Sequence, residues 1–259
     1  MKQSIELIDS LAHPTLTGKW LSSHEDSSFS SLIKSMKDGN FNRSLAIGMD
    51  NIENYSHESF INECKLYPEL IPVAGLNPFC DLEKEFSLIK KLGFKAVKLH
   101  PRFSCFNMNI DTLKNIFQSS LNYNLPVLLC TYFYTSVDKI IKQDPFYILT
   151  EALSHVPNCK CVLVHGGGVE VLKYAELVRF NPNLLLDLSL TIMKYTGSSI
   201  DHDISFLLNH FDRRICIGTD FPEYSHRELF NKLESLSTGI SEDKIKNFCG
   251  LNLINFLEI

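Results

Sequence analysis

The sequence lacks several patterns that identify common functional classes. No apolar run approaches the roughly 20 residues that a helix needs to cross a bilayer. No basic stripe occurs and the formal net charge is −5, so nucleic acid is not expected as the main partner. No G-x-G-x-x-G follows the first apolar run, which disfavours a dinucleotide-binding sheet. A G-x-S-x-G elbow is also absent, which argues against a lipase-like role for the His165-Gly-Gly-Gly run.

The eight cysteines form no CxxC pair, which removes the commonest signature of a thiol redox or zinc site. Several of them lie inside apolar, strand-like runs, as reduced core cysteines do. The first residues do not resemble a signal peptide, because Glu6 and Asp9 interrupt the apolar residues there. We therefore expect a cytoplasmic protein with no membrane segment.

Short apolar runs recur along the 259 residues, with helical patterns between them. Their starts are spaced by roughly 25 to 40 residues, about the length of a βαβ unit. The predicted strands are 5–9, 44–48, 71–76, 96–100, 126–130, 161–165, 184–188 and 215–218. Eight strands alternating with helices predict a (β/α)8 TIM barrel, slightly trimmed, as a single domain over residues 1–259.

Two of the predicted helices carry end signals. Asp81 can cap a helix that Gly93 ends. Asp111 can cap a second helix, which stops before Pro126. These signals place the predicted helices between the strands.

Two predicted strands deliver a polar side chain to a tight loop. His165 ends one strand and precedes three glycines, and Asp220 ends another and precedes Pro222 by two residues. TIM barrels carry their chemistry at the carboxyl ends of the strands. We therefore predict an active site that contains His165 and Asp220 as its catalytic residues.

Alternation along the other strands adds candidates to this end of the barrel. A period of two puts Asp9, Leu11 and His13 on one face of the first strand. The same period puts Lys98 and His100 on one face of the fourth strand. Four residues are expected to contact substrate: Lys98, His100, Arg102 and Tyr132. A surface position for Arg102 and a barrel-interior pairing for Lys98 remain alternatives.

Five segments, in this order, resemble signatures of the amidohydrolase superfamily. They are 8–13 (IDSLAH), 93–101 (GFKAVKLHP), 163–167 (LVHGG), 218–222 (GTDFP) and 249–257 (CGLNLINFL). The resemblance covers nearly the whole chain and points to the amidohydrolase-2 branch of metal-dependent TIM-barrel hydrolases and decarboxylases. It implies a small-molecule substrate, and a homodimer is a further expectation.

The resemblance also implies a metal site, but a degenerate one. His13, His165 and Asp220 stand at positions where the superfamily binds metal, whereas Leu11 and Cys130 stand where it has histidines. A cysteine thiolate can bind zinc. One zinc or manganese ion held by His13, Cys130 and Asp220, with His165 able to replace one of them, is therefore one expectation. A plain buried thiol at Cys130 and no cofactor is the other.

A metal-free mechanism is implied by relatives that hydrolyse lactones without metal, using the eighth-strand aspartate as a base. Asp220 would then activate water, and His165, Lys98 or Arg102 would stabilise the oxyanion. An aspartate in that role is expected to need a raised pKa.

The sequence thus predicts a hydrolase that acts on a C–N or C–O bond (amide, lactone or ester) of a small polar or anionic molecule. The water would be activated by a metal or by Asp220 alone. Two alternatives remain open: a catalytically inactive relative kept as a binding or scaffold protein, and a decarboxylase of the same branch.

Overall fold

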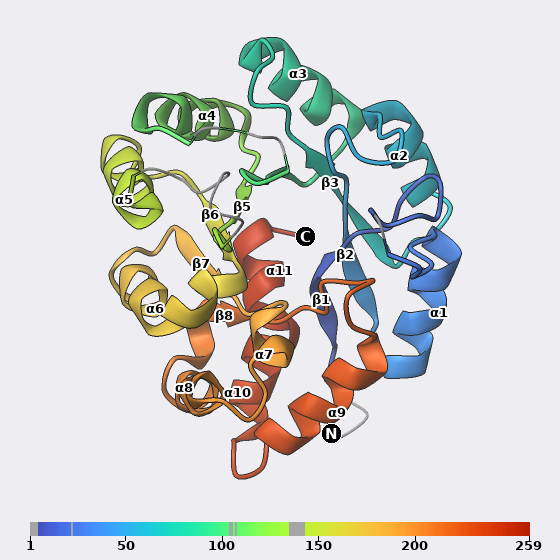
Figure 1. Ribbon diagram of the computed structural model, residues 1–259, viewed down its shortest axis with the longest axis vertical. Coiled ribbons are helices and arrows are strands. Elements are labelled where there is room, and N and C mark those ends of the chain that lie inside the picture. The colour runs from blue at the N-terminus through green and yellow to red at the C-terminus, as the bar shows by residue number, and fades with distance from the viewer. Residues whose placement is uncertain (1–4, 22, 104–105, 107, 135–142) are drawn as a thin grey trace.

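The chain forms an eight-stranded parallel barrel inside a ring of helices (Figure 1). The computed structural model describes residues 5–21, 23–103, 106, 108–134 and 143–259. The strands are β1 (Ile8–Ala12), β2 (Arg43–Ile47), β3 (Leu70–Gly75), β4 (Ala96–Leu99), β5 (Val127–Cys130), β6 (Cys161–Val164), β7 (Leu184–Asp187) and β8 (Ile215–Cys216). Backbone hydrogen bonds from Ser10 to Ile217 (2.9 Å) and from Asp220 to Leu11 (3.0 Å) join the segment after β8 to β1. The predicted TIM barrel is confirmed, although the first strand begins three residues later than predicted.

The helices that cover the strands begin and end largely at local signals. They are α1 (Phe29–Gly39), α2 (His57–Cys64), α3 (Leu82–Leu92), α4 (Ile110–Tyr123), α5 (Pro145–His155), α6 (Val171–Phe180), α7 (Thr191–Lys194), α8 (Ser199–His210), α9 (His226–Leu236), α10 (Glu242–Lys246) and α11 (Asn252–Leu257). Asp81 caps α3 and Gly93 ends it at φ 96°, as predicted. The predicted cap Asp111 is wrong. Asn109 caps α4 from an extended backbone, and Asp111 lies in the first turn, where the helix dipole favours its charge.

The C-terminal helix α11 closes one end of the barrel. Leu253 and Leu257 belong to the same apolar cluster as interior residues of the barrel such as Leu45 and Leu128. The side chain of Asn252 donates to the carbonyl of Ile215 at the start of β8 (2.7 Å), so α11 lies at the amino-terminal end of the strands. Figure 1 shows α11 in the middle of the ring of helices. The opposite end, where the strands finish, is left for the polar residues predicted from the sequence.

Strand β1 departs from regular alternation. Its register against β2 shifts between Asp9 and Ala12, so Leu11 joins the apolar interior while Asp9 turns toward β8 and α9. Asp9 Oδ1 accepts from the backbone nitrogen of Thr219 (2.9 Å), and Oδ2 lies 2.9 Å from His226 Nε2. The prediction that Asp9, Leu11 and His13 share one face is therefore wrong, because the irregularity separates Asp9 from Leu11.

No helix among the described ranges combines the length and the apolar character that a bilayer span requires.

Candidate active site

The two predicted catalytic residues both adopt a left-handed backbone. His165 directly follows β6 with φ 67°, and Asp220 lies in the loop after β8 with φ 58°. This region is uncommon for residues other than glycine and costs on the order of 1–3 kcal/mol, so it persists where the surrounding structure enforces it. After His165 the turn is completed by glycines, and a Cβ on Gly167 would lie 2.1 Å from the ring of Tyr174. Both residues therefore sit where strained backbone commonly marks a functional site.

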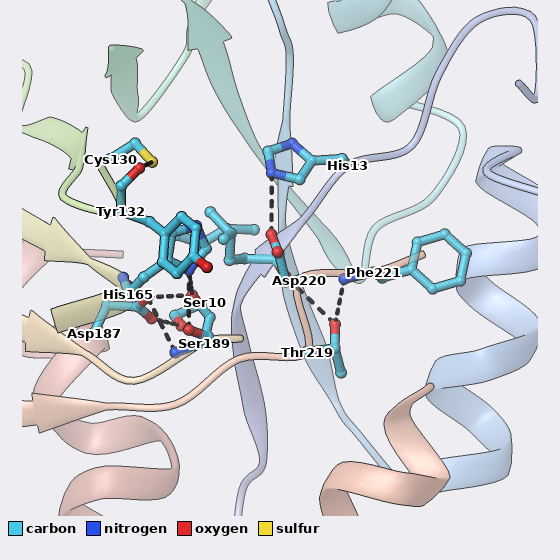
Figure 2. A network of polar contacts seen from close by, with 12 residues as sticks. Ser10, His13, Cys130, Tyr132, His165, Asp187, Ser189, Thr219, Asp220 and Phe221 are labelled. Atoms are coloured by element: carbon cyan, nitrogen blue, oxygen red, sulfur yellow. Dashed lines mark hydrogen bonds and ion pairs between the residues drawn. The ribbon is translucent and has the colours of Figure 1, made fainter. Parts of the chain in front are cut away.

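The imidazole of His165 is held by the end of β7 (Figure 2). Its Nδ1 lies 2.9 Å from the carbonyl oxygen of Ser189, so Nδ1 carries a proton and donates it to that oxygen. The backbone nitrogen of His165 donates to Asp187 Oδ1 (3.1 Å). Asp187 is fully buried and also accepts from the hydroxyls of Ser189 and Ser10. This network engages Nδ1, so only Nε2 of the His165 ring can serve the site.

Asp220 faces a second imidazole, that of His13 (Figure 2). His13 Nε2 lies 3.5 Å from Asp220 Oδ1, and its ring stacks on Trp20 with centroids 4.9 Å apart. Burial alone would raise the pKa of Asp220, but His165, His13 and Lys98 together hold that pKa below its usual value. The raised pKa that an aspartate base at this position was expected to need is therefore not found. Asp220 is an ionised carboxylate, because its interactions with these three side chains outweigh its loss of solvent.

Cys130 lies between two imidazoles at the end of β5. In the strand register, Leu129 lies beside Leu99 of β4, and Cys130 lies beside Val164 of β6. His100 follows Leu99 and His165 follows Val164, so both imidazoles lie level with the thiol. The thiol is hydrogen-bonded to the side chains of His100 and His165. Burial would raise its pKa, but the two imidazoles outweigh burial and hold the pKa of Cys130 well below the usual value.

Lys98 brings a buried ammonium group to the same end of the barrel. The side chain is 2% exposed, and Nζ has no hydrogen-bond partner among the described residues. Burial lowers the pKa of Lys98, while the charges of Cys130, Asp220 and Asp187 raise it and offset part of that effect. An unpaired buried ammonium is costly to a fold, so its donor is available to a ligand.

Aromatic and cationic side chains also gather around Tyr132. Arg102 Cζ lies 5.0 Å from the centroid of the Tyr132 ring, and the Nζ of Lys194 lies 5.9 Å from it. The Tyr132 ring in turn contacts His165 edge-on at 6.2 Å. Of the predicted contacts, Arg102 and Tyr132 therefore lie together with His165.

No role was predicted for Trp20 or Ser189. Trp20 is the only tryptophan of the chain and follows the first predicted strand closely, which was a usable signal. Ser189 ends a predicted strand, but its link to His165 depends on β6 and β7 being neighbours. Only the fold reveals that link.

The donors do not fit the expected metal ion. Among the residues that the structure describes, no group of three histidine, cysteine, aspartate or glutamate side chains is arranged to hold one. Leu11 occupies the position on β1 where a metal-binding histidine was expected, and it packs into the barrel interior. The thiol of Cys130 is already engaged by two imidazoles, and Lys98 adds a positive charge nearby. We therefore derive no chemistry through zinc or manganese.

No protein-family model matches the sequence, and no curated protein does. Solved structures do resemble it. A TIM-barrel protein from Bordetella bronchiseptica is 19% identical with a TM-score of 0.78, over 98% of this chain and 99% of that chain. A probable 2-pyrone-4,6-dicarboxylic acid hydrolase from Acinetobacter baumannii, solved with citric acid, is 15% identical with a TM-score of 0.70, over 98% and 100%. A 5-carboxyvanillate decarboxylase from Sphingomonas paucimobilis is 10% identical with a TM-score of 0.72, over 99% and 100%.

At these identities the likeness concerns the fold. The structures that this chain resembles are amidohydrolase-superfamily TIM barrels, among them hydrolases and a decarboxylase. The resemblance predicted from the sequence motifs is thus confirmed at the level of the fold.

Proposed function

We propose that the protein hydrolyses an acyl C–O or C–N bond of a small anionic molecule without the help of a metal ion. The observation that carries the proposal is the pairing of an ionised carboxylate, Asp220, with a buried ammonium that lacks a hydrogen-bond partner, Lys98. A hydrolase needs these two functions together: an acceptor for the proton of water and a donor for the oxyanion.

The residues divide the reaction between them. The carboxylate of Asp220, beside His13, accepts a hydrogen bond from water and takes its proton as the water attacks. Lys98 donates to the carbonyl oxygen and stabilises the charge that develops there. Arg102, above the Tyr132 ring, supplies a planar cation for a carboxylate of the substrate. His100 contacts the site through Cys130.

The buried ammonium of Lys98 also argues against an inactive relative. Because Nζ has no hydrogen-bond partner in the part of the chain that the structure describes, its burial lowers the stability of the fold, and such a cost is commonly retained where a function depends on it. Location in the cytoplasm and assembly into a homodimer remain proposals that rest on the sequence alone.

The test is hydrolysis of a panel of lactones, esters and amides, each with and without a carboxylate, by chelator-treated wild type and Asp220→Asn. We expect turnover of carboxylated compounds that survives the chelator and is lost in Asp220→Asn. The matched control is Glu223→Gln, an exposed acid in the same loop. Release of CO2 instead of hydrolysis would favour the decarboxylase. If wild type and Asp220→Asn bind the compounds of the panel equally well and neither turns them over, the result would favour a binding protein.

A further inference from the structure

We infer that Cys130 is a nucleophile, and that the acyl group of the substrate passes through a thioester on its sulfur before water releases it. This inference rests on the proposed hydrolysis and deepens it. Its first support is the position of the thiol, which two neighbouring strands enclose between imidazoles. A nucleophile with a base in hydrogen-bond reach, the base itself oriented by a third group, is the recurring arrangement of covalent catalysis.

The two imidazoles play opposite roles because their other nitrogens are already engaged. His165 donates from Nδ1 to Ser189 O, which leaves the lone pair of Nε2 to accept the thiol proton. His100 accepts at Nδ1 from the backbone nitrogen of Phe103 (3.4 Å), so its proton is on Nε2 and can be donated to sulfur. One imidazole removes the proton and the other stabilises the resulting thiolate.

The base is oriented by a buried carboxylate. Asp187 accepts from the hydroxyl of Ser189, and the same hydroxyl oxygen lies 3.2 Å from Nδ1 of His165. Figure 2 shows the contacts that run from Asp187 through Ser189 to His165. The side chain of His165 is in turn hydrogen-bonded to Cys130. These contacts fix the tautomer and the ring plane that a general base for a thiol requires.

A second observation concerns a different side chain, Lys98. The ammonium of Lys98 is 2% exposed, lacks a hydrogen-bond partner among the described residues, and interacts electrostatically with Cys130. A donor of this kind beside the nucleophile is what the oxyanion of an acyl transfer requires.

Burial alone does not produce this environment. Cys161 on β6 is equally buried, yet it packs among the apolar residues between barrel and helices, and its pKa lies well above the usual value. Burial also raises the pKa of Cys64, Cys80, Cys159, Cys216 and Cys249. Cys130 is the exception among the cysteines that the structure describes.

The reaction balances with water as the only co-reactant. The thiol proton passes to Nε2 of His165, and the sulfur electron pair forms a C–S bond at the carbonyl carbon. The C–O or C–N bond then breaks, and the leaving group takes the proton from His165. Water held by Asp220 and His13 adds to the thioester and gives a proton to Asp220. The C–S bond breaks, the acid leaves, and that proton returns through His165 to the sulfur, which restores the thiol. One water is consumed for each C–O or C–N bond of the substrate that is hydrolysed.

The experiment uses the activated ester mono-4-nitrophenyl adipate, rapid acid quench, and intact-mass and peptide-mass analysis. Because Asp220 serves only the second step, we expect Asp220→Asn to release about one nitrophenolate per chain in a burst and to carry one acyl group on Cys130. Cys130→Ala should lose both the burst and the acyl group, and steady hydrolysis should fall at least 100-fold. The matched control is Cys161→Ala, which should behave as wild type does.

The possible outcomes separate the two proposals. If Cys130→Ala hydrolyses the ester within twofold of wild type and Asp220→Asn carries no acyl group, water attacks directly. The thioester is then overturned while the hydrolase stands. If wild type hydrolyses neither this ester nor the panel above, both proposals fail. Acylation of Asp220→Asn is measured with Cys130 in place, so a folding defect in Cys130→Ala cannot obscure the result.

Discussion

The Nδ1 atom of His165 lies 2.9 Å from the carbonyl oxygen of Ser189. A carbonyl oxygen can only accept, so this contact keeps the ring proton on Nδ1 and turns the unprotonated nitrogen toward Cys130. The position of the Ser189 carbonyl after β7 therefore determines which ring nitrogen of His165, after β6, can act as a base.

Replacing Asp220 with asparagine should abolish turnover and leave the fold intact. Asparagine keeps the shape of the side chain and tolerates the left-handed backbone at φ 58°, but it cannot take a proton from water. Loss of a general base lowers kcat by about 10²–10⁴. Steady-state kinetics on any compound the wild type turns over, with a thermal melt of each protein, would measure this. A kcat within threefold of wild type would contradict the role of Asp220.

Replacing Lys98 with methionine should make the protein more stable and less active. Methionine fills a similar volume without burying an ammonium that lacks a partner, so we expect a gain of about 1 kcal/mol or more in the free energy of unfolding. The loss of the oxyanion donor should lower kcat about 10²–10³-fold. Urea unfolding and kinetics measure the two effects, and exposed Lys95→Met is the control. Unchanged stability together with unchanged kcat would show that Lys98 is solvated and takes no part in catalysis.

The same variant should change how stability depends on pH. Burial lowers the pKa of Lys98 below the 10.5 of an exposed lysine, so the native protein binds this proton less tightly than the unfolded chain. Wild type should therefore gain stability as the pH rises from the lowered pKa toward 10.5, and Lys98→Met should lack this gain. Urea unfolding of both proteins from pH 7 to pH 10 tests the sign.

Alkylation of Cys130 should be nearly independent of pH, in contrast to Cys80. The pKa of Cys130 lies well below the usual value, so its thiolate fraction should rise much less than tenfold per pH unit between pH 7 and pH 9. The pKa of Cys80 is raised to about 11, so its thiolate fraction should rise about tenfold per pH unit. Iodoacetamide labelling from pH 7 to pH 9, followed peptide by peptide, gives both slopes. Limited access of the reagent to a buried thiol lowers its labelling rate by the same factor at every pH and leaves the slope unchanged. A tenfold rise in the labelling rate of Cys130 per pH unit would therefore refute a stabilised thiolate.

Breaking the buried pair between Asp9 and His226 should destabilise the barrel where it closes. Both side chains are fully buried, with Oδ2 and Nε2 2.9 Å apart in an ion-pair contact that is not a linear hydrogen bond. His226→Ala leaves the buried carboxylate of Asp9 without this contact, which costs about 3–5 kcal/mol if the two groups form an ion pair. Urea unfolding measures the loss, with exposed His202→Ala as the control. A loss below 1 kcal/mol would mean that Thr219 and the backbone of Leu11 satisfy Asp9 without His226.

Local patterns predicted most of the fold and the location of the site. The strands are short apolar runs, and the loops after His165 and Asp220 carry glycine or proline, so both features lie in neighbouring residues. The turn of Asp9 toward α9 could not be predicted, because it depends on the closure between β1 and β8. The contacts of Cys130 depend on the adjacent strands β4, β5 and β6. The lowered pKa of Asp220 depends on side chains that β1, β4 and β6 position.

The left-handed backbone of His165 and Asp220 limits how this site can change over generations. Asparagine, aspartate, histidine and glycine adopt such a φ readily, whereas a β-branched side chain there is strained. Most single replacements at these two positions would therefore be removed for poor folding before their catalysis was ever selected. A lineage that loses the activity should drift first to asparagine or glycine at position 220, and that residue would record the loss.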